Sequence, residues 1–390
     1  MKVLVVSHNF PRFAGDPAGA FVARLAGALG QRGVDVRAVV PHAAGLAEAD
    51  TIEGVPVRRV RYGPDRWERV AYTGQLHRSA FSKPATALML VPFLLALRRA
   101  VRQEAAQFQP DLIHAHWWFP GGWAALAAGR PVVVTCHGSD VRLLEHSRLA
   151  RLLGRGVLRK AAAVTAVSQF LLDGVAAQSG PLRETLVTRM PIDLPVFEAG
   201  RAVAKADPPI VLYAGNLVPT KGVDTLLDAI GILVGRGIRV RLRILGQGGE
   251  EGRLRARAEQ LGLGSVVEWS PFLPQQAMPA EYGRASVTVL PSRGGTEGLG
   301  LTLVEALAAG SAVVGTRSGG IPEVVEDELT GRLVPPDHPG ALADALVSLL
   351  SNPGELARLT EQGQRRVSRE YGVDAAVTTF LELFRRVAPD

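Results

Sequence analysis

The sequence contains a single cysteine, Cys136, which lies within the apolar run PVVVTC. One cysteine excludes an intramolecular disulfide, and its apolar surroundings predict a buried, unreactive thiol in a reducing compartment. Long apolar runs are also missing. The longest one covers residues 85–97 and is interrupted by Pro92, whereas a membrane span needs about 20 apolar residues. Because the apolar start of the chain is too short for a secretion signal, we expect a cytoplasmic protein without a membrane-spanning helix.

Lysine is scarce as well. Of the 44 basic residues only five are lysines, so arginine carries nearly all of the positive charge. This bias, together with abundant alanine and glycine, is typical of GC-rich coding sequences, and the net charge of +7 is therefore weak evidence for function. The basic residues are scattered and no recognition motif accompanies them, which argues against nucleic-acid binding.

Strand-like and helix-like segments alternate along the 390 residues, a length that favours two domains. Apolar runs such as KVLVVS, DLIHAHW and PVVVTCH predict strands, and residues 18–32, 85–107 and 169–178 predict helices between them. The alternation lapses into Pro, Gly, Ala and charged residues near residues 192–207, and then begins again with PIVLYAGN. This pattern predicts an α/β protein with parallel sheets that are covered by helices on both faces.

We therefore predict two doubly wound, Rossmann-like domains, 1–192 and 208–370, joined by a linker at 193–207. A C-terminal helix at 371–390 is expected to pack back towards the first domain. Ligands of doubly wound sheets bind at the carboxyl ends of the strands, and two such domains usually enclose a cleft. The motifs CHGSD, GNLVPTKG and RGGTEGLG all follow predicted strands, so we expect them to meet in a central cleft.

The segment GGTEGLGLTLVEALAAG places Glu297 and Glu305 around a glycine-rich loop that runs into a predicted helix. The free amides at the start of such a helix favour an anion, most often a phosphate. Because two carboxylates would repel a phosphate, we expect them to accept hydrogen bonds from hydroxyls. A ligand with both groups is a nucleotide or a nucleotide sugar. The alternative is an ordinary helix with Glu297 in its acidic first turn and Glu305 in solvent.

The motifs YAGNLVPTKGVDTLLDAI, ILGQG, PSRGGTEGLGLTLVEALAAG, SGGIPEVV and GRLVPPD occur in this order, after GAFVARLAGAL, DLIHAHW and HGSDV. Through these motifs most of the chain resembles glycosyltransferase family 4, whose members are retaining enzymes of the GT-B fold. The resemblance implies a hexosyltransferase that moves a sugar from a nucleoside-diphosphate sugar to a glycan, lipid-linked or small-molecule acceptor. It further implies a role in bacterial polysaccharide or glycolipid synthesis, with no cofactor besides the donor substrate.

The resemblance also implies roles for residues of the second domain. Glu297 would contact hydroxyls of the donor sugar, and Glu305 would take the ribose hydroxyls. Lys221 would pair with the diphosphate, on which negative charge builds up as the glycosidic bond breaks. The family usually has an arginine where this chain has Asn216, which can donate a hydrogen bond but carries no charge. The other implied donor contacts are Gly19 in the first domain and, in the second, Phe272, Leu273, Gly298, Leu299, Gly300 and Leu301.

In the first domain, the resemblance places His137 beside the reacting sugar, as a catalytic residue together with Lys221 and Glu297. The alternative is a structural histidine in a strand-end loop. Asp140 either tunes this histidine or, more commonly for such a residue, caps the following helix. His116 and Trp117 are implied to line the acceptor side.

A metal or a redox cofactor is not expected. His114 and His116 point to one face of a strand, as a pair of metal ligands would, but we find no third ligand at a suitable spacing and no Asp-x-Asp sequence. The turn SHNFPRFAGDPAG lacks the glycine fingerprint of nicotinamide enzymes. No lysine follows Lys221, which argues against a pyridoxal-dependent phosphorylase of this fold. A non-catalytic nucleotide-sugar-binding subunit and a GT-B epimerase stay open as alternatives.

Residues 146–160, HSRLARLLGRGVLRK, interleave arginine with leucine. A basic amphipathic segment of this kind predicts reversible contact with an anionic membrane surface, which would bring a cytoplasmic enzyme to a lipid-linked acceptor at the inner face of the plasma membrane. The apolar run at 85–97 lies in the same predicted domain. The alternative is a plain surface helix in an arginine-rich protein.

Overall fold

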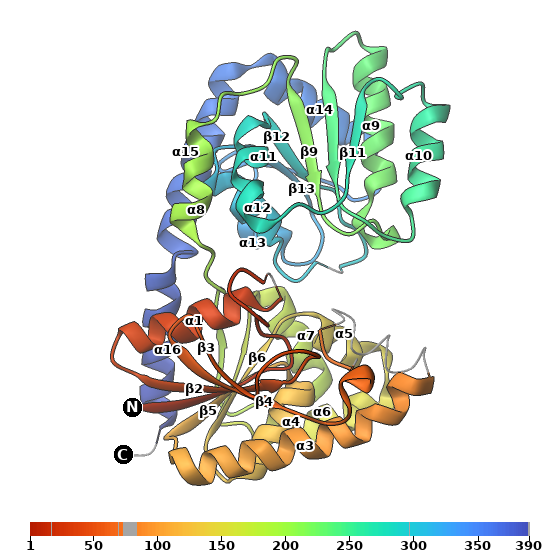
Figure 1. Ribbon diagram of the computed structural model, residues 1–390. Helices are drawn as coiled ribbons and strands as arrows, with labels where there is room; N and C mark the ends of the chain where they lie inside the picture. The colour runs from red at the N-terminus through yellow and green to blue at the C-terminus, as the bar shows by residue number, and fades with distance from the viewer. Residues whose placement is uncertain (17, 69, 73–83, 296, 389–390) are drawn as a thin grey trace. The chain divides into compact units, whose positions relative to one another are not determined.

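The computed structural model describes residues 1–16, 18–68, 70–72, 84–295 and 297–388 (Figure 1). The chain forms two compact units. The first consists of Met1–Pro191 and Val373–Asp390, and the second of Ile192–Gly372. Each unit contains one sheet with helices on both of its faces (Figure 1). In the described residues, no helix is both long and apolar enough to cross a bilayer.

The first unit is built around an eight-stranded sheet in the order β3-β4-β2-β1-β5-β6-β7-β8, in which only the β3–β4 pair is antiparallel. The central strands β5 and β6 are buried along their whole length, as expected for parallel strands covered on both faces. The sequence did not predict β3, a short and mostly exposed edge strand with little apolar content. The strands are β1 (Lys2–Val6), β2 (Asp35–Pro41), β3 (Ala49–Ile52), β4 (Val55–Val60), β5 (Leu112–His116), β6 (Val132–Cys136), β7 (Ala163–Ala166) and β8 (Thr185–Val187).

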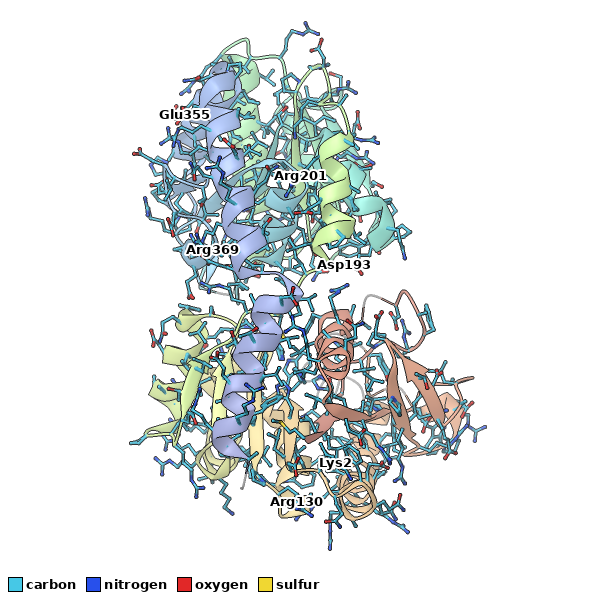
Figure 2. All side chains as sticks on the ribbon, turned by 90° about the vertical axis from the view of Figure 1, so that its left-hand side faces the viewer. Lys2, Arg130, Asp193, Arg201, Glu355 and Arg369 are labelled. Atoms are coloured by element: carbon cyan, nitrogen blue, oxygen red, sulfur yellow. The ribbon has the colours of Figure 1, made fainter. Side chains whose placement is uncertain are left out.

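Helices cover both faces of this sheet. The helices α1 and α16 pack together on one face, and α3, α4 and α6 lie on the opposite face (Figure 1). The C-terminal helix α16 lies along the first unit (Figure 2), where Phe380 and Phe384 are fully buried and their rings lie 4.9 and 5.3 Å from the ring of His114. The helices are α1 (Ala20–Gln31), α3 (Pro84–Phe108), α4 (Trp123–Ala125), α5 (Ser139–His146), α6 (Arg148–Lys160), α7 (Gln169–Ser179) and α16 (Val373–Val387).

The second unit is built around a six-stranded parallel sheet in the order β11-β10-β9-β12-β13-β14. The helices α9, α10 and α14 lie on one face, and α11, α12 and α15 lie on the other (Figures 1 and 2). The strands are β9 (Ile210–Ala214), β10 (Arg241–Leu245), β11 (Val267–Ser270), β12 (Val287–Leu290), β13 (Ala312–Thr316) and β14 (Arg332–Val334). The helices are α8 (Leu194–Glu198), α9 (Val223–Gly235), α10 (Glu251–Gln260), α11 (Met278–Arg284), α12 (Leu301–Ala308), α13 (Ile321–Val324), α14 (Pro339–Ser351) and α15 (Pro353–Glu370).

The segment 193–207, predicted as a linker, belongs to the second unit. It contains α8 and a turn of 3-10 helix at Ala199–Ala202. Its one aromatic side chain, Phe197, is buried and lies 6.1 Å from the ring of Tyr282 in α11. Local composition suggested a linker, but this buried ring and the hydrogen bonds of Arg201 and Lys205 to backbone carbonyls attach the segment to the second unit.

The strand order of each sheet reverses at one point, between β1 and β5 in the first unit and between β9 and β12 in the second. Doubly wound sheets bind ligands outside the carboxyl ends of the strands at such a point. In the first unit the loops after β1 and β6 carry Gly19 and His137, and His116 is the last residue of β5. In the second unit the loops after β9 and β12 carry Lys221 and Glu297. The fold therefore gathers the predicted residues at one edge of each sheet.

Candidate active site

Lys221 and Glu297 form an ion pair at the switch point of the second sheet. The ammonium of Lys221 donates a hydrogen bond to Oε2 of Glu297, and the hydroxyl of Ser292 donates to the same oxygen at 3.1 Å. Lys221 ends the turn Pro219–Lys221 after β9, while Glu297 follows the neighbouring strand β12. Their side chains are 21% and 15% exposed, so this pair stays open to solvent and to a ligand.

Backbone packing explains why these two loops meet. Gly222, directly after Lys221, has a φ of 65°, and a Cβ atom there would overlap the carbonyl oxygen of Pro291. Next to this contact, the amide of Arg293 donates to the carbonyl of Thr220 at 2.9 Å. Only glycine tolerates both the dihedral angle and the close approach. The glycine after Lys221 thus lets the lysine turn and the glutamate loop press against each other.

Arg293 is a cation near this pair that sequence reasoning missed. Its guanidinium contacts Asp224, reaches the hydroxyl of Thr225 at 3.1 Å, and pairs with Asp337 at 2.8 Å. The same group lies 3.5 Å from the place where a Cβ of Gly222 would stand. Because its partners are distant in the sequence, no local signal distinguished this arginine from the many others.

Glu305 lies on α12, and its Oε2 accepts a hydrogen bond of 3.0 Å from the hydroxyl of Tyr282. The helix begins after Gly300, and buried Leu299 and Leu303 attach it to the core. Glu305 itself is half-buried. The predicted ribose-binding carboxylate therefore accepts a hydrogen bond from a buried tyrosine, which sequence reasoning also missed.

The other predicted donor contacts of the second unit also lie at the carboxyl edge of its sheet. Asn216 follows β9 and is exposed, and its carbonyl accepts a hydrogen bond of 2.8 Å from the hydroxyl of Tyr213. Phe272 follows β11 and is 51% exposed, while Leu273 beside it is half-buried. The amide of Gly320 donates to the carbonyl of Glu297 at 3.0 Å and ties this loop to the one after β13. Four predicted residues connect Glu297 to α12 or begin that helix: Gly298, Leu299, Gly300 and Leu301.

In the first unit, His137 follows β6 and shares a hydrogen bond of 3.0 Å with His116, between its Nε2 and Nδ1 of His116. Its ring is packed 4.3 Å from Trp117 and 5.1 Å from Phe21. Burial lowers the pKa of His137 to about 3 and the pKa of His116 well below 6.5. Both imidazoles are therefore neutral near pH 7. His137 can act there as a polar hydrogen-bonding group and not as a cation.

The shared hydrogen bond links the tautomers of the two rings. If Nδ1 of His116 donates, His137 carries its proton on Nδ1 and presents a donor from that atom. If Nε2 of His137 donates, its Nδ1 is an acceptor instead. The tautomer of His116 is therefore coupled to the kind of hydrogen bond that Nδ1 of His137 can make.

Asp140 does not cap a helix, contrary to the commoner expectation. Helix α5 is preceded by Gly138, and no side chain caps it. The carboxylate of Asp140 instead accepts hydrogen bonds from the amides of His137 and Gly138, both at 3.0 Å, and from the amide of Trp118 at 3.3 Å. Burial raises its pKa above the usual 3.8, against the effect of these hydrogen bonds. Asp140 thus joins the loop after β6 to the loop after β5 and holds the backbone of His137.

The residues predicted for the acceptor side are buried. The exposed fractions of His116, Trp117 and Asp140 are 1%, 7% and 4%. Trp117 packs against the ring of His8, 4.6 Å away in the loop after β1, and its Nε1 donates to the hydroxyl of Ser139 at 3.2 Å. In this structure they pack around His137 beneath the surface. Gly19 lies in the same loop after β1, where it precedes α1 with a φ of 65°.

The histidine pair on β5 is not arranged as a metal site. His114 is fully buried, and its Nε2 bonds the hydroxyl of Thr135 at 2.7 Å. Within the described residues, the one group of side chains close enough to hold a metal is His42, Asp65 and Glu68. Both nitrogens of His42 already have protein partners there, the carboxylate of Glu68 and the carbonyl of Leu46.

Comparison with known proteins identifies the class. Residues 198–366 match the model of glycosyl transferases group 1, and residues 18–193 match the model of glycosyltransferase family 4. The D-inositol 3-phosphate glycosyltransferase of Saccharomonospora viridis is 30% identical and aligns with 94% of this chain and 88% of its own length. WcaL of Escherichia coli, named as a colanic acid biosynthesis glycosyltransferase, is 32% identical over 71% of each chain. The chain is a group 1 glycosyltransferase, and it belongs to glycosyltransferase family 4.

Solved structures show the same architecture. Sucrose-phosphate synthase from Thermosynechococcus elongatus superposes with a TM-score of 0.78 at 21% identity, over 99% of this chain and 98% of that one. HepE of Anabaena, solved in complex with UDP and glucose, superposes with a TM-score of 0.71 at 21% identity, over 99% of this chain and all of that one. The fold is GT-B.

Proposed function

We propose that this glycosyltransferase transfers a hexose from a nucleoside-diphosphate sugar, with retention of the anomeric configuration, to a glycan, lipid-linked or small-molecule acceptor in bacterial polysaccharide or glycolipid synthesis. The ion pair of Lys221 with Glu297 at the switch point of the second sheet carries the proposal. It sets a cation for a diphosphate beside a carboxylate for sugar hydroxyls, in the place where such sheets bind nucleotides. The name of the Escherichia coli relative, in colanic acid biosynthesis, supports a glycan acceptor, and the name of the Saccharomonospora viridis relative, with D-inositol 3-phosphate, supports a small-molecule acceptor.

In the proposed reaction, the bond from the anomeric carbon to the diphosphate oxygen breaks, and the bond to the acceptor oxygen forms on the same face. The departing phosphate takes up the proton of the acceptor hydroxyl. Lys221 stabilises the negative charge that develops on the diphosphate, and Glu297 orients the sugar through its hydroxyls. Neutral His137 contributes a hydrogen bond to the sugar. We propose that the reaction needs no metal. The positive charge of Lys221 and the hydrogen-bond donors of the amides before α12 would stabilise the diphosphate in its place.

Donor choice and stereochemistry test this proposal. Purified protein is mixed with UDP-, GDP- and ADP-sugars, and its melting temperature is measured with each one. A ligand at 100 times its dissociation constant adds about 2.7 kcal/mol of stability, which makes the true donor easy to detect. The anomeric configuration of the product is then read by NMR, with EDTA present in a parallel reaction. An inverted product, or activity that EDTA abolishes, would contradict the proposed mechanism.

We further propose that the enzyme acts in the cytoplasm, at an anionic membrane surface that it contacts through the first unit. Helix α6 presents Leu149, Leu152 and Leu153 to solvent, with exposed fractions of 67%, 68% and 50%. Helix α3, on the same face of the sheet, presents Leu88, Val91 and Leu95 at 68%, 59% and 61% (Figure 1). Two outward apolar rows on one face exceed what a solvated helix requires and suit shallow insertion between lipid headgroups.

The arginines of α6 also make hydrogen bonds within the first unit, so they are unsuitable for testing membrane contact by substitution. Arg155 donates to the carbonyl of Gln178 at 2.6 Å, and Arg159 donates to that of Ser179 at 2.8 Å, at the C-terminal end of α7. Arg151 donates to the carbonyls of Leu144 and Glu145 at 3.1 and 2.8 Å. These arginines cap helix ends and fix α6 in place. Reversing their charge would therefore disturb the fold as well as any membrane contact.

The exposed leucines of α6 allow membrane contact to be tested without removing these arginine contacts. Leu149, Leu152 and Leu153 are replaced together by serine, and sedimentation with anionic liposomes is compared at low and high salt. Wild type should sediment at low salt and be released in high salt, because salt screens the attraction of the basic residues to the lipids. The triple variant should stay in the supernatant. A control with Val234→Ser and Leu329→Ser, exposed apolar residues of the second unit, should sediment like wild type. If wild type does not sediment at low salt, the acceptor is a soluble molecule.

A further inference from the structure

Tyr282 contributes a buried hydroxyl to the candidate donor site. The residue lies in α11, is 1% exposed, and packs 6.1 Å from the ring of Phe197. Its hydroxyl donates a hydrogen bond of 3.0 Å to Oε2 of Glu305 on α12. A buried hydroxyl requires hydrogen-bond partners, and here they are the side chain of Thr302 and a carboxylate at the edge of the site.

Tyr282 is the donor of this hydrogen bond. Burial, and then the charge of Glu305, raise the pKa of Tyr282 well above 10, so the hydroxyl keeps its proton near pH 7. An ionised carboxylate only accepts hydrogen bonds. Such charge-assisted bonds are roughly twice as strong as bonds between neutral groups. The core thus fixes one end of this bond, and the half-buried Glu305 has to align with it.

We propose that Tyr282 is a positioning residue, which holds the carboxylate of Glu305 toward the ribose hydroxyls of the donor and so strengthens the preference for ribonucleotides over deoxyribonucleotides. This inference rests on the proposed donor class and on the ribose role of Glu305. A carboxylate offers about four acceptor sites, so Glu305 can accept from the tyrosine and from the ribose hydroxyls at the same time.

Another buried tyrosine of the second unit provides a matched control. Tyr371 is also 1% exposed, and its hydroxyl reaches a backbone carbonyl, that of Glu323, at 3.4 Å. Its replacement by phenylalanine removes a hydroxyl of similar burial without touching Glu305. A general loss of packing would change nucleotide binding in both tyrosine variants. Loss of the positioning of Glu305 would change it in Tyr282→Phe alone.

The test compares the binding of UDP and of 2′-deoxy-UDP by calorimetry, with ADP and GDP pairs used instead if UDP does not bind. Wild type should bind the ribonucleotide about tenfold more tightly, the effect of one hydrogen bond to a charged group. Glu305→Ala should reduce this ratio to about one. Tyr282→Phe should reduce it about threefold, and Tyr371→Phe should leave it unchanged. In the double variant Tyr282→Phe, Glu305→Ala, the ratio should equal that of Glu305→Ala, because the tyrosine acts only through the carboxylate.

The outcomes distinguish the positioning role of Tyr282 from the ribose-binding role of Glu305. If Glu305→Ala loses the preference and Tyr282→Phe retains the wild-type ratio, the positioning role is overturned while the ribose role of Glu305 stands. If Glu305→Ala itself retains the ratio, Glu305 does not bind ribose, and the inference is overturned with that assignment. If the ratio of the two affinities in the double variant differs from the ratio in Glu305→Ala, Tyr282 acts by another route and the inference is wrong.

Discussion

His116 and His137 share one hydrogen bond between two neutral imidazoles, at the carboxyl ends of neighbouring strands β5 and β6. We expect His116→Phe to lower kcat about tenfold with little change in KM, because His137 then loses the partner that sets its tautomer. His116→Asn should recover part of the rate, since its amide can replace Nδ1. The ¹⁵N shifts of the His137 ring provide an independent reading. If the phenylalanine variant leaves those shifts unchanged, His116 does not set the tautomer.

The buried histidines predict how stability depends on pH. Burial lowers the pKa of His8 to about 4 and the pKa values of His114 and His137 to about 3 in the folded protein, below the ordinary 6.5. Between these values the unfolded chain binds more protons, so the free energy of unfolding falls as the pH decreases from about 6.5 toward 4. Each histidine contributes up to about 1.4 kcal/mol per pH unit. Asp140, with its raised pKa, acts in the opposite direction and reduces the slope.

Urea unfolding between pH 7.5 and 5, followed by tryptophan fluorescence, measures this effect. Four of the five tryptophans, Trp67, Trp117, Trp118 and Trp123, lie in the first unit together with the histidines. His114→Leu should flatten the slope, because it removes one of the neutral groups. A constant free energy of unfolding over this range would show that the histidines are not held neutral.

The two glutamates should differ in what they bind. Glu305→Ala should weaken binding of the bare nucleoside diphosphate by about 1 to 3 kcal/mol, the loss of one or two hydrogen bonds from the ribose. Glu297→Ala should leave that affinity nearly unchanged and mainly lower the turnover of the sugar donor. Calorimetry and steady-state kinetics on the two variants separate these effects. Equal and unchanged nucleotide affinities would contradict the ribose assignment.

Gly222→Ala should displace Lys221. The new Cβ would overlap the carbonyl of Pro291, and alanine is also strained at a φ of 65°. We expect a loss of about 1 to 3 kcal/mol in stability and a lower kcat. Gly235→Ala, at the last residue of α9 and with open space around it, should instead be neutral or stabilise the protein by up to about 1 kcal/mol. Similar losses in both variants would show that the packing against Pro291 has no special role.

Much of the fold followed from local sequence. The apolar runs that became β1, β5, β6, β9 and β12 are continuous because parallel strands are buried on both faces. Their order along the chain, alternating with helical segments, predicted two doubly wound sheets. The position of Lys221 and of Glu297 just after strands was also enough to place them at carboxyl ends. Polarity and periodicity are local properties, so the sequence alone determined these features.

Tertiary structure decided which side chains are covered and which partners they meet. His116 ends strand β5 and Trp117 follows it, and the loops after β1 and β6 cover both side chains. Tyr282 meets Glu305, and Arg293 meets Asp224 and Asp337, across separations that no periodicity reveals. The arginines of α6 resemble a membrane-facing row in sequence but cap α7 in the structure. Burial and pairing depend on what packs on a residue from elsewhere in the chain, and only the folded chain brings those segments together.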